Sequence, residues 1–326
     1  MMSLVQCTLC PHACRMRDYE RGRCRVRVNQ EGKLYTLVYG KPCAVHVDPI
    51  EKKPMFHMYP GSGSFSIATA GCCLSCKYCQ NWQISQAYPE ETRNVDLAPE
   101  EVVAQAMSER CRSIAYTYSD PIIFYEYTYD TAVLAHQKGL ANILVTCGFI
   151  NTEPLKEIAP YIDGANVDLK GFSEEFYESV TGGRLGPVLD TLVAMKDSGI
   201  LVEITNLIVP TLNDEPTMIR QMCRWIAQHM GRQTPLHFSR FYPQYQLQNL
   251  PPTPLHTLQS AREIAMDEGL HYVYIGNIDD VQAQQTYCES CGRVIVGRSG
   301  YRVTQYNLKG DACRFCNTKI HGLWYD

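Results

Sequence analysis

Three cysteines in one short loop place the strongest constraint on this chain. Cys72, Cys76 and Cys79 stand at C-x3-C-x2-C spacing. Three thiolates can hold three irons of a cubane iron–sulfur cluster, which leaves the fourth iron without a protein ligand. An open metal position distinguishes a catalytic metal site from a closed structural one. The spacing therefore predicts a cluster with one coordination position free for a cofactor or substrate.

Cys73 offers a second interpretation, because Cys73, Cys76 and Cys79 also spell the C-x2-C-x2-C of bacterial ferredoxins. Such an electron-transfer cluster needs a fourth cysteine, typically three residues further on. That position holds Gln83, and the next cysteine is Cys111. We therefore favour the open site, with Cys73 outside the cluster. A fully ligated cluster with Cys73 as its fourth ligand is the alternative.

The chain has 16 cysteines in 326 residues, and two further groups have metal-ligand spacing. One group lies near the start and fits a closed four-thiolate site for zinc or an iron–sulfur cluster, with zinc slightly favoured. Its members are Cys7, Cys10, Cys14 and Cys24. The other group consists of two C-x2-C pairs around a hairpin-like segment, which predicts a four-cysteine zinc ribbon with rubredoxin-like iron as the minor option. Its members are Cys288, Cys291, Cys313 and Cys316.

Composition excludes several classes of protein. The net charge is −4 and no lysine or arginine run occurs, so neither nucleic acid nor an anionic membrane surface is an expected partner. The first residues lack the apolar core of a signal peptide, and no apolar run approaches the ~18 residues of a membrane span. We expect a cytoplasmic protein, where thiols stay reduced and bind metals rather than form disulfides.

Strand-like and helix-like segments alternate about every 30 residues after residue 64, which indicates an α/β fold with a parallel sheet. Strands are expected at 65–69, 113–117, 142–146, 165–169, 201–209 and 236–239, with 271–275 as a candidate edge strand. Helices are expected at 99–110, 122–138, 154–158, 174–180, 188–196, 215–229 and 255–267. Residues 1–60 would form a Cys-rich extension, 61–280 the central domain and 281–326 the ribbon module.

Reacting groups in a barrel of parallel strands lie at the carboxyl ends of the strands. That rule selects polar residues at or after the second to the sixth strand. They are Ser119, Asp120, Thr146, Asp168, Lys170, Thr205, Asn206 and, as a weaker candidate, His237. Asp120 could accept a hydrogen bond from a ligand ammonium group, although a plain Ser-Asp-Pro turn explains it equally well. Asp168 and Lys170 share one face of their strand, and polar residues on the fifth strand fit a ribose-binding wall.

The loop around Cys72 resembles the cluster loop of the radical S-adenosylmethionine (SAM) superfamily, including the aromatic Tyr78 directly before the last cysteine. The resemblance implies a partial (β/α)6 barrel and a [4Fe-4S] cluster whose free iron binds the amino and carboxylate groups of SAM. It also implies one-electron cleavage of SAM to methionine and a 5′-deoxyadenosyl radical. Tyr78 thereby joins the expected cofactor contacts.

The barrel is similar to that of the pyruvate formate-lyase activating enzyme group. Residues 119–121 take the place of the Gly-Gly-Glu that holds the SAM ammonium, and residues 146–148 match the group's Thr-Asn-Gly. Residues 168–170 match its Asp-Ile-Lys, in which the lysine meets the SAM carboxylate. Asp replaces Glu, Cys replaces Asn, and Thr205 stands where those enzymes carry an arginine. These departures affect recognition of a glycyl radical partner more than SAM binding.

Across nearly its whole length the chain looks most like the radical SAM member of the AmmeMemoRadiSam group. The shared features are the Cys-x2-Cys-Pro-His-x-Cys opening, residues 48–54, 79–82 and 208–214, and the terminal ribbon. The group's name implies company with two other conserved proteins. It does not imply a substrate.

We therefore expect a radical SAM enzyme of oxidoreductase type that abstracts hydrogen from a small molecule or peptide, with a flavodoxin or ferredoxin as reductant. Its cofactors would be a [4Fe-4S] cluster, SAM and one or two zinc ions, which iron could replace. The alternatives are an activase of a glycyl radical enzyme and a non-catalytic metal-binding or electron-transfer protein. Residues 48–61 would form either a plain connector or a lid with Lys53 and His57 facing the cluster.

Overall fold

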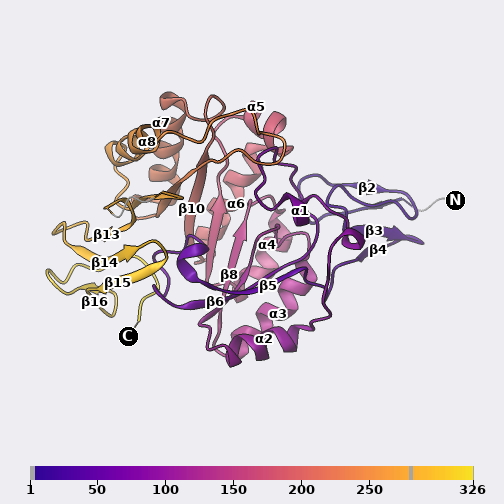
Figure 1. The fold of residues 1–326 in the computed structure, drawn as a ribbon. Coiled ribbons are helices and arrows are strands. Elements are labelled where there is room, and N and C mark those ends of the chain that lie inside the picture. Colours follow the sequence, from indigo (N-terminus) through magenta and orange to yellow (C-terminus); the bar gives the residue numbers. More distant parts are fainter. Residues whose placement is uncertain (1–3, 279–281, 326) are drawn as a thin grey trace.

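The centre of the molecule is an eight-stranded sheet with the order β12-β11-β10-β9-β8-β7-β6-β5 (Figure 1). The computed structural model describes residues 4–278 and 282–325. Neighbouring strands from β6 to β12 are parallel, and β5 pairs with β6 antiparallel at one edge. The strands are β5 (Ala44–Pro49), β6 (Gly63–Ala68), β7 (Ser113–Tyr116), β8 (Ala141–Thr146), β9 (Gly164–Asp168), β10 (Leu201–Ile208), β11 (Leu236–Arg240) and β12 (Val273–Gly276).

Helices in the connections cover the outer face of this sheet. The strands from β7 to β11 are mostly buried runs, as expected for a parallel sheet shielded on both faces. Pro99 opens α2 at the first helical turn, where its missing N–H costs no intrahelical bond. The helices are α1 (Trp82–Ser85), α2 (Pro99–Ser108), α3 (Tyr125–Gln137), α4 (Thr152–Ile158), α5 (Glu174–Phe176), α6 (Leu185–Asp197), α7 (Pro216–Trp225) and α8 (Leu255–Asp267).

The expected alternation of strands and helices is found, and β12 supplies the candidate edge strand. The strand β5 was not expected. Its residues run beside β6 from Ala44 opposite Ala68 to Pro49 opposite Gly63. Its side chains are mostly exposed or half-buried, so the sequence carries no clear periodic signal there. Residues 44–49 form a strand because they pair with β6, and their own sequence does not predict that pairing. Within the described residues, no helix is both long and apolar enough to cross a bilayer.

Two small hairpins form the N-terminal extension, which projects at one end of the molecule in Figure 1. They are β1 (Val5–Gln6) with β2 (Arg15–Met16) and β3 (Arg27–Gln30) with β4 (Lys33–Thr36). Arg27 anchors the second hairpin, because its guanidinium forms an ion pair of 2.5 Å with Glu126 of α3. Asn151 holds the first segment: its backbone N–H donates to Leu9 O at 3.0 Å.

The C-terminal ribbon lies at the opposite end in the same view. It consists of β13 (Thr286–Tyr287), β14 (Val294–Ser299) and β15 (Arg302–Tyr306), followed by the short pair β16 (Leu308–Lys309) and β17 (Ala312–Cys313). Its apolar residues pack against Phe56 and against Tyr272 and Tyr274 of the last sheet segment. The ribbon is therefore part of the wall of the sheet domain rather than a separate appendage.

Arg298 of β14 joins the ribbon to the domain through a fully buried guanidinium. One terminal nitrogen donates to Phe56 O at 2.7 Å and the other to Thr286 Oγ1 at 2.8 Å. Its Nε lies 3.5 Å from a carboxylate oxygen of Glu51, whose side chain is also fully buried. Removing one partner of a buried ion pair leaves the other charge without compensation.

We expect Arg298→Met to lower the free energy of unfolding by about 3–5 kcal/mol, because Glu51 and two hydrogen-bond acceptors lose their partner in the interior. Chemical denaturation of the metal-loaded protein, followed by circular dichroism, measures this change. Arg302→Met, at an exposed position of β15, is the matched control and should change stability by less than about 0.5 kcal/mol. Equal midpoints for the two variants would contradict the proposed anchoring.

Candidate active site

A large cavity of about 890 Å³ opens at the carboxyl ends of the parallel strands. The loops after β6, β7, β8 and β9 and the ends of β10, β11 and β12 all contribute to it. Almost every residue that the sequence singled out lines its wall: Cys72, Cys76, Cys79, Tyr78, Ser119, Asp120, Thr146, Asp168, Lys170, Thr205 and His237. Residues widely separated in sequence therefore share one space, as the strand-end rule requires.

The cysteine loop that follows β6 is fixed by backbone hydrogen bonds to the segment after α5. The N–H of Ser75 donates to Thr181 O at 2.8 Å, and the N–H of Lys77 donates to Val180 O at 3.0 Å. Gly182 makes this contact possible: its φ is +73°, and a Cβ there would lie 2.4 Å from Ser75 Oγ. These bonds hold the loop against the barrel and orient its thiols toward the cavity.

The three loop thiols face one region of the cavity but are not packed as ligands of a single ion. Cys76 is buried, and Cys72 and Cys79 are half-buried. Burial raises the pKa of Cys76, and the neighbouring Cys72 and Cys79 thiols raise it further. Among the described residues, the groups whose ligand atoms all lie within 4.8 Å of one another do not include these three thiols. Wider spacing is what ligands of three different irons require, so the thiols fit a cluster better than a mononuclear ion.

A charged pair also lines the cavity. Lys170 Nζ lies 2.9 Å from a carboxylate oxygen of Asp168, and the two side chains project from the same face at the end of β9. Burial alone would lower the pKa of Lys170, but the neighbouring Asp168 carboxylate raises it well above its ordinary value. The ammonium is therefore charged, and it lies on the wall of the cavity.

Asp120 is buried beneath the loop that follows β7. Its carboxylate accepts hydrogen bonds from the N–H of Cys147 at 2.7 Å and from the N–H of Ile122 at 3.0 Å, and the Thr146 hydroxyl lies within 3.1 Å. A carboxylate has about four lone-pair sites, so it can still accept from a ligand ammonium. These bonds fix the orientation of Asp120 without using all of its hydrogen-bond acceptor sites.

Tyr78 gives the clearest sign that a ligand belongs in this cavity. Its side chain is buried, and its hydroxyl has no hydrogen-bond partner among the described residues. An unsatisfied buried hydroxyl is costly unless a ligand supplies the partner. Asn206, in contrast, does not line the cavity: its amide donates to Leu169 O at 2.7 Å on the other face of β10. The alternation of β10 sends Thr205 inward and Asn206 away.

Of the two residues expected to face the cluster, Lys53 lines the cavity and His57 does not. Lys53 lines the cavity and forms an ion pair of 2.6 Å with Asp48. His57 is fully buried behind the cavity, where its ring nitrogens lie 2.7 Å from His321 O and from the Tyr274 hydroxyl. The sequence could not separate the two, because the ribbon that covers His57 is more than 200 residues away along the chain.

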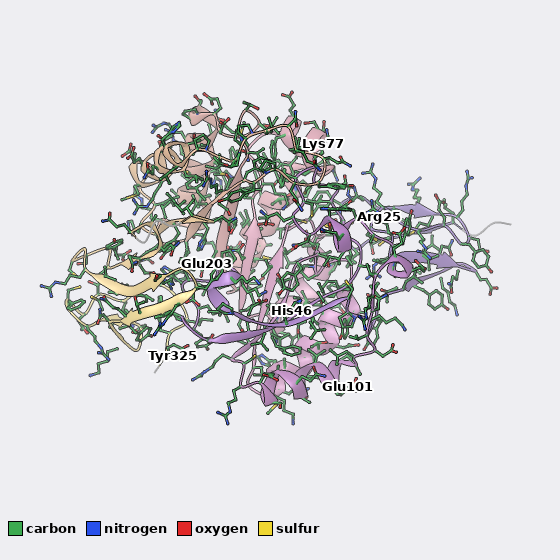
Figure 2. All side chains as sticks on the ribbon, in the orientation of Figure 1. Arg25, His46, Lys77, Glu101, Glu203 and Tyr325 are labelled. Carbon is green, nitrogen blue, oxygen red and sulfur yellow. The ribbon has the colours of Figure 1, made fainter. Side chains whose placement is uncertain are left out.

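Glu203 is a hydrogen-bond partner for two buried polar groups, the His57 N–H and the His237 ring. One carboxylate oxygen lies 2.7 Å from His237 Nε2, and the other accepts from the His57 N–H at 2.7 Å. Figure 2 shows Glu203 between the sheet and the ribbon. His237 is thus a partnered histidine at the cavity wall, which agrees with its weak standing in the sequence.

Several cavity residues carry no signal in the sequence. Gln284 and Tyr301 of the C-terminal region line the cavity, and so do Phe56, Tyr242 and Tyr274. Tyr301 reaches the cavity because the ribbon packs against Tyr272 and Tyr274 beside the sheet. Asn81 is different, because it lies two residues after Cys79 and its amide donates to Tyr118 O at 2.9 Å. Its proximity to the cysteine motif could have identified it.

The four ribbon cysteines are arranged as ligands of one ion. All four sulfurs lie within 4.8 Å of one another. Cys288 and Cys316 are 3.5 Å apart, and Cys291 and Cys313 are 3.8 Å apart. Tetrahedral zinc with bonds of about 2.3 Å places its sulfurs about 3.8 Å apart, which matches these separations. The donor set therefore fits zinc, and rubredoxin-like iron has the same geometry.

Comparison with known proteins agrees with this site. The Radical SAM superfamily profile matches residues 66–225. The uncharacterized protein MJ0808 of Methanocaldococcus jannaschii is 44% identical over 318 residues, which cover 97% of this chain and 95% of that protein. The pyruvate formate-lyase-activating enzyme of Clostridium pasteurianum is 24% identical over 165 residues, or 48% of this chain and 66% of that enzyme.

Solved structures share the architecture. A radical SAM methyltransferase from Sphaerobacter thermophilus aligns with a TM-score of 0.53 at 15% identity, covering 72% of this chain and 71% of that one. The chain belongs to the radical SAM superfamily. The expected α/β fold of radical SAM type with a ribbon-like C-terminal module is confirmed. Membership points to an enzyme that carries out radical SAM chemistry.

The buried His57 predicts how stability depends on pH. Burial lowers its pKa to about 4, whereas an unfolded histidine titrates near 6.5. As pH falls from about 6.5 to about 4, the unfolded chain binds a proton that the folded chain does not, so stability falls over that range by up to about 3 kcal/mol. Above pH 6.5 this contribution is fully present.

Denaturant midpoints at pH 7 and pH 5 check this expectation. His57→Gln should be less stable than wild type at pH 7, because it loses hydrogen bonds, but its stability should change less between the two pH values. His256→Gln, at an exposed position, should keep the wild-type dependence. An unchanged pH dependence in His57→Gln would refute the assignment to this residue.

Proposed function

We propose that this protein is a radical SAM enzyme in which Cys72, Cys76 and Cys79 hold a [4Fe-4S] cluster and the adjoining cavity holds SAM. The bound cofactors would supply one-electron cleavage of SAM and abstraction of a hydrogen atom from the substrate. The chain's own residues position SAM and exclude water. The observation that carries this proposal is the gathering around one cavity of three thiols, a charged lysine and a tyrosine hydroxyl that has no hydrogen-bond partner among the described residues.

Each polar group in the cavity has a role that its surroundings support. Lys170, already oriented by Asp168, would bind the carboxylate of SAM through a charge-assisted hydrogen bond. Asp120, held in place by two backbone N–H groups, would accept from the SAM ammonium. Tyr78 would donate its hydroxyl to the adenosine portion. Ser119, Thr146 and Thr205 would complete the polar wall beside the ribose.

The part of the cavity farther from the thiols supports a small-molecule or peptide substrate. Phe56, Tyr242 and Tyr274 provide aromatic surface there, and Arg240 lines the wall with its Nε bound to Thr253 O at 2.8 Å. A guanidinium beside aromatic rings favours a substrate with an anionic group and an apolar part. A flavodoxin or ferredoxin would serve as the one-electron donor.

Activation of a glycyl radical enzyme is the second candidate. The sequence similarity to the C. pasteurianum activating enzyme favours it, although that similarity covers only 48% of this chain. The features shared with the AmmeMemoRadiSam group extend over nearly the whole chain, and we propose that the protein is its radical SAM member. An activase would leave a glycyl radical on a partner protein, which electron paramagnetic resonance (EPR) detects, whereas direct modification would not.

Anaerobically reconstituted protein, given dithionite and SAM, should form 5′-deoxyadenosine and methionine in a reaction that Cys76→Ala abolishes. The physical reason is that loss of one of three ligands leaves the cluster unable to reduce SAM. Liquid chromatography with mass spectrometry measures the products. Cys43→Ala, which removes a thiol outside the three metal-ligand groups, is the matched control and should retain activity. If wild type forms no more 5′-deoxyadenosine than Cys76→Ala, the proposal is wrong.

Lys170→Met should weaken SAM binding by about 10- to 100-fold, because a hydrogen bond to a charged group contributes about 1.5–3 kcal/mol. Titration of the reconstituted protein with SAM, followed by the EPR change of the reduced cluster, measures the affinity. Lys156→Met removes an exposed lysine of α4 and should leave the affinity unchanged. Equal affinities in the two variants would exclude Lys170 from the SAM site.

A further inference from the structure

The N-terminal cysteines surround a second, smaller cavity on the other side of the cluster loop. Its lining includes all four of them, Cys7, Cys10, Cys14 and Cys24, together with Arg27 and Cys73. The β1–β2 hairpin closes it, because the N–H of Cys7 donates to Cys14 O at 2.9 Å. The four thiols between Cys7 and Cys24 thus converge on one space, which is the arrangement of a fully ligated metal centre.

The spacing of these thiols separates them from the ribbon site. The ribbon sulfurs all lie within 4.8 Å of one another, as ligands of one ion do. In the part of the chain that the structure describes, no three of the N-terminal thiols form such a group. The same holds for the three loop thiols. Ligands of different irons in one cluster stand farther apart than ligands of a single zinc, so the N-terminal set fits an iron–sulfur cluster rather than zinc.

Arg27 provides an independent sign of an anionic group in this cavity. Its side chain is 4% exposed, and its terminal nitrogens are bound to Glu126. Its Nε has no hydrogen-bond partner among the described residues, although Arg27 lines the cavity. A cluster with four thiolate ligands carries net negative charge and exposes sulfide acceptors, so it would satisfy this buried donor.

The two thiol-lined cavities meet at the Cys72–Cys73 segment of the cluster loop. Cys72 lines the large cavity, and the adjacent Cys73 lines the small one. The Cys73 sulfur lies 3.5 Å from that of Cys147, which also lines the large cavity. The N-terminal extension also lies against the start of the cluster loop. A Cβ at Gly71 would lie 2.4 Å from Cys24 O, so there is no room for a side chain at this position. The N-terminal extension is therefore pressed directly onto the cluster loop.

We propose that Cys7, Cys10, Cys14 and Cys24 hold an auxiliary iron–sulfur cluster that passes single electrons to the SAM-binding cluster across the Cys72–Cys73 segment. In each transfer the auxiliary cluster is oxidised by one electron and the SAM-binding cluster is reduced by one. A low-potential donor of the flavodoxin or ferredoxin class then restores the auxiliary cluster. Four protein ligands leave it no open iron, so it transfers electrons and does not bind SAM. The electron-transfer role rests on the proposed function, whereas the identity of the metal does not.

Metal analysis of the full-length chain after anaerobic reconstitution tests the site. We expect about eight irons and about one zinc in wild type, and about four irons in the triple variant Cys72→Ala/Cys76→Ala/Cys79→Ala. That remaining iron should give an EPR signal after dithionite reduction that SAM does not alter. Adding Cys10→Ala and Cys14→Ala should remove it while the ribbon zinc remains, which shows that the chain is still folded. Cys43→Ala should match wild type.

About four irons and two zincs in wild type, with no iron in the triple variant, would overturn the proposal whether or not that variant is well folded. A reduced wild type whose two EPR signals show no magnetic interaction would exclude the close approach of the clusters.

Arg27→Met should shift the reduction potential of the auxiliary cluster to a more negative value, and in Arg27→Lys the potential should return most of the way to the wild-type value. If 5′-deoxyadenosine forms but the N-terminal site holds zinc, only this inference fails. If the triple variant keeps its cluster but wild type makes no 5′-deoxyadenosine, only the proposed function fails.

Discussion

Parallel pairing of neighbouring strands is the constraint on which the rest of this structure depends. Because β6 to β12 run in one direction, every strand ends at the same edge of the sheet. Groups separated by up to about 200 residues thereby meet in one cavity, from the cysteine loop after β6 to the end of β12. Beyond the strand ends, backbone N–H and C=O groups no longer pair with a neighbouring strand, so they need other hydrogen-bond partners. The Ser75 and Lys77 N–H groups find them in the carbonyls of Thr181 and Val180, which hold the cysteine loop against the barrel.

Buried charges attach the two terminal segments to this framework. Arg27 joins the N-terminal hairpins to α3, and Arg298 joins the ribbon to the segment at Glu51 and Phe56. Burying an arginine is favourable only when carboxylate and carbonyl partners replace water, so each contact holds in one geometry. Specific placement matters here because both segments border cavities: the ribbon contributes Tyr301 to the large one, and the hairpins form the small one.

Sulfur spacing relates the three cysteine groups to their chemistry. Short distances at the ribbon fit one tetrahedral ion, whereas the wider sets at the loop and at the N-terminus fit clusters. The sequence favoured zinc slightly for the N-terminal set, because C-x2-C pairs occur in both kinds of site. Spacing along the chain does not fix spacing in space, since the irregular intervals between Cys10, Cys14 and Cys24 can close on either centre. The two clusters that we infer would lie back to back, separated by Cys73.

The sequence by itself determined the features that depend on local periodicity and on short motifs. These include the alternation of strands and helices, the Cys72, Cys76 and Cys79 loop, and the strand-end residues such as Asp120 and Lys170. Tertiary structure alone decided what depends on contacts between distant segments. It made residues 44–49 an edge strand, decided that the Thr205 face of β10 and not the Asn206 face lines the cavity, and buried His57 beneath the ribbon. The physical reason is that a local pattern records which residues are apolar or polar, whereas only the packing of distant segments decides which polar groups meet a partner and which face a ligand.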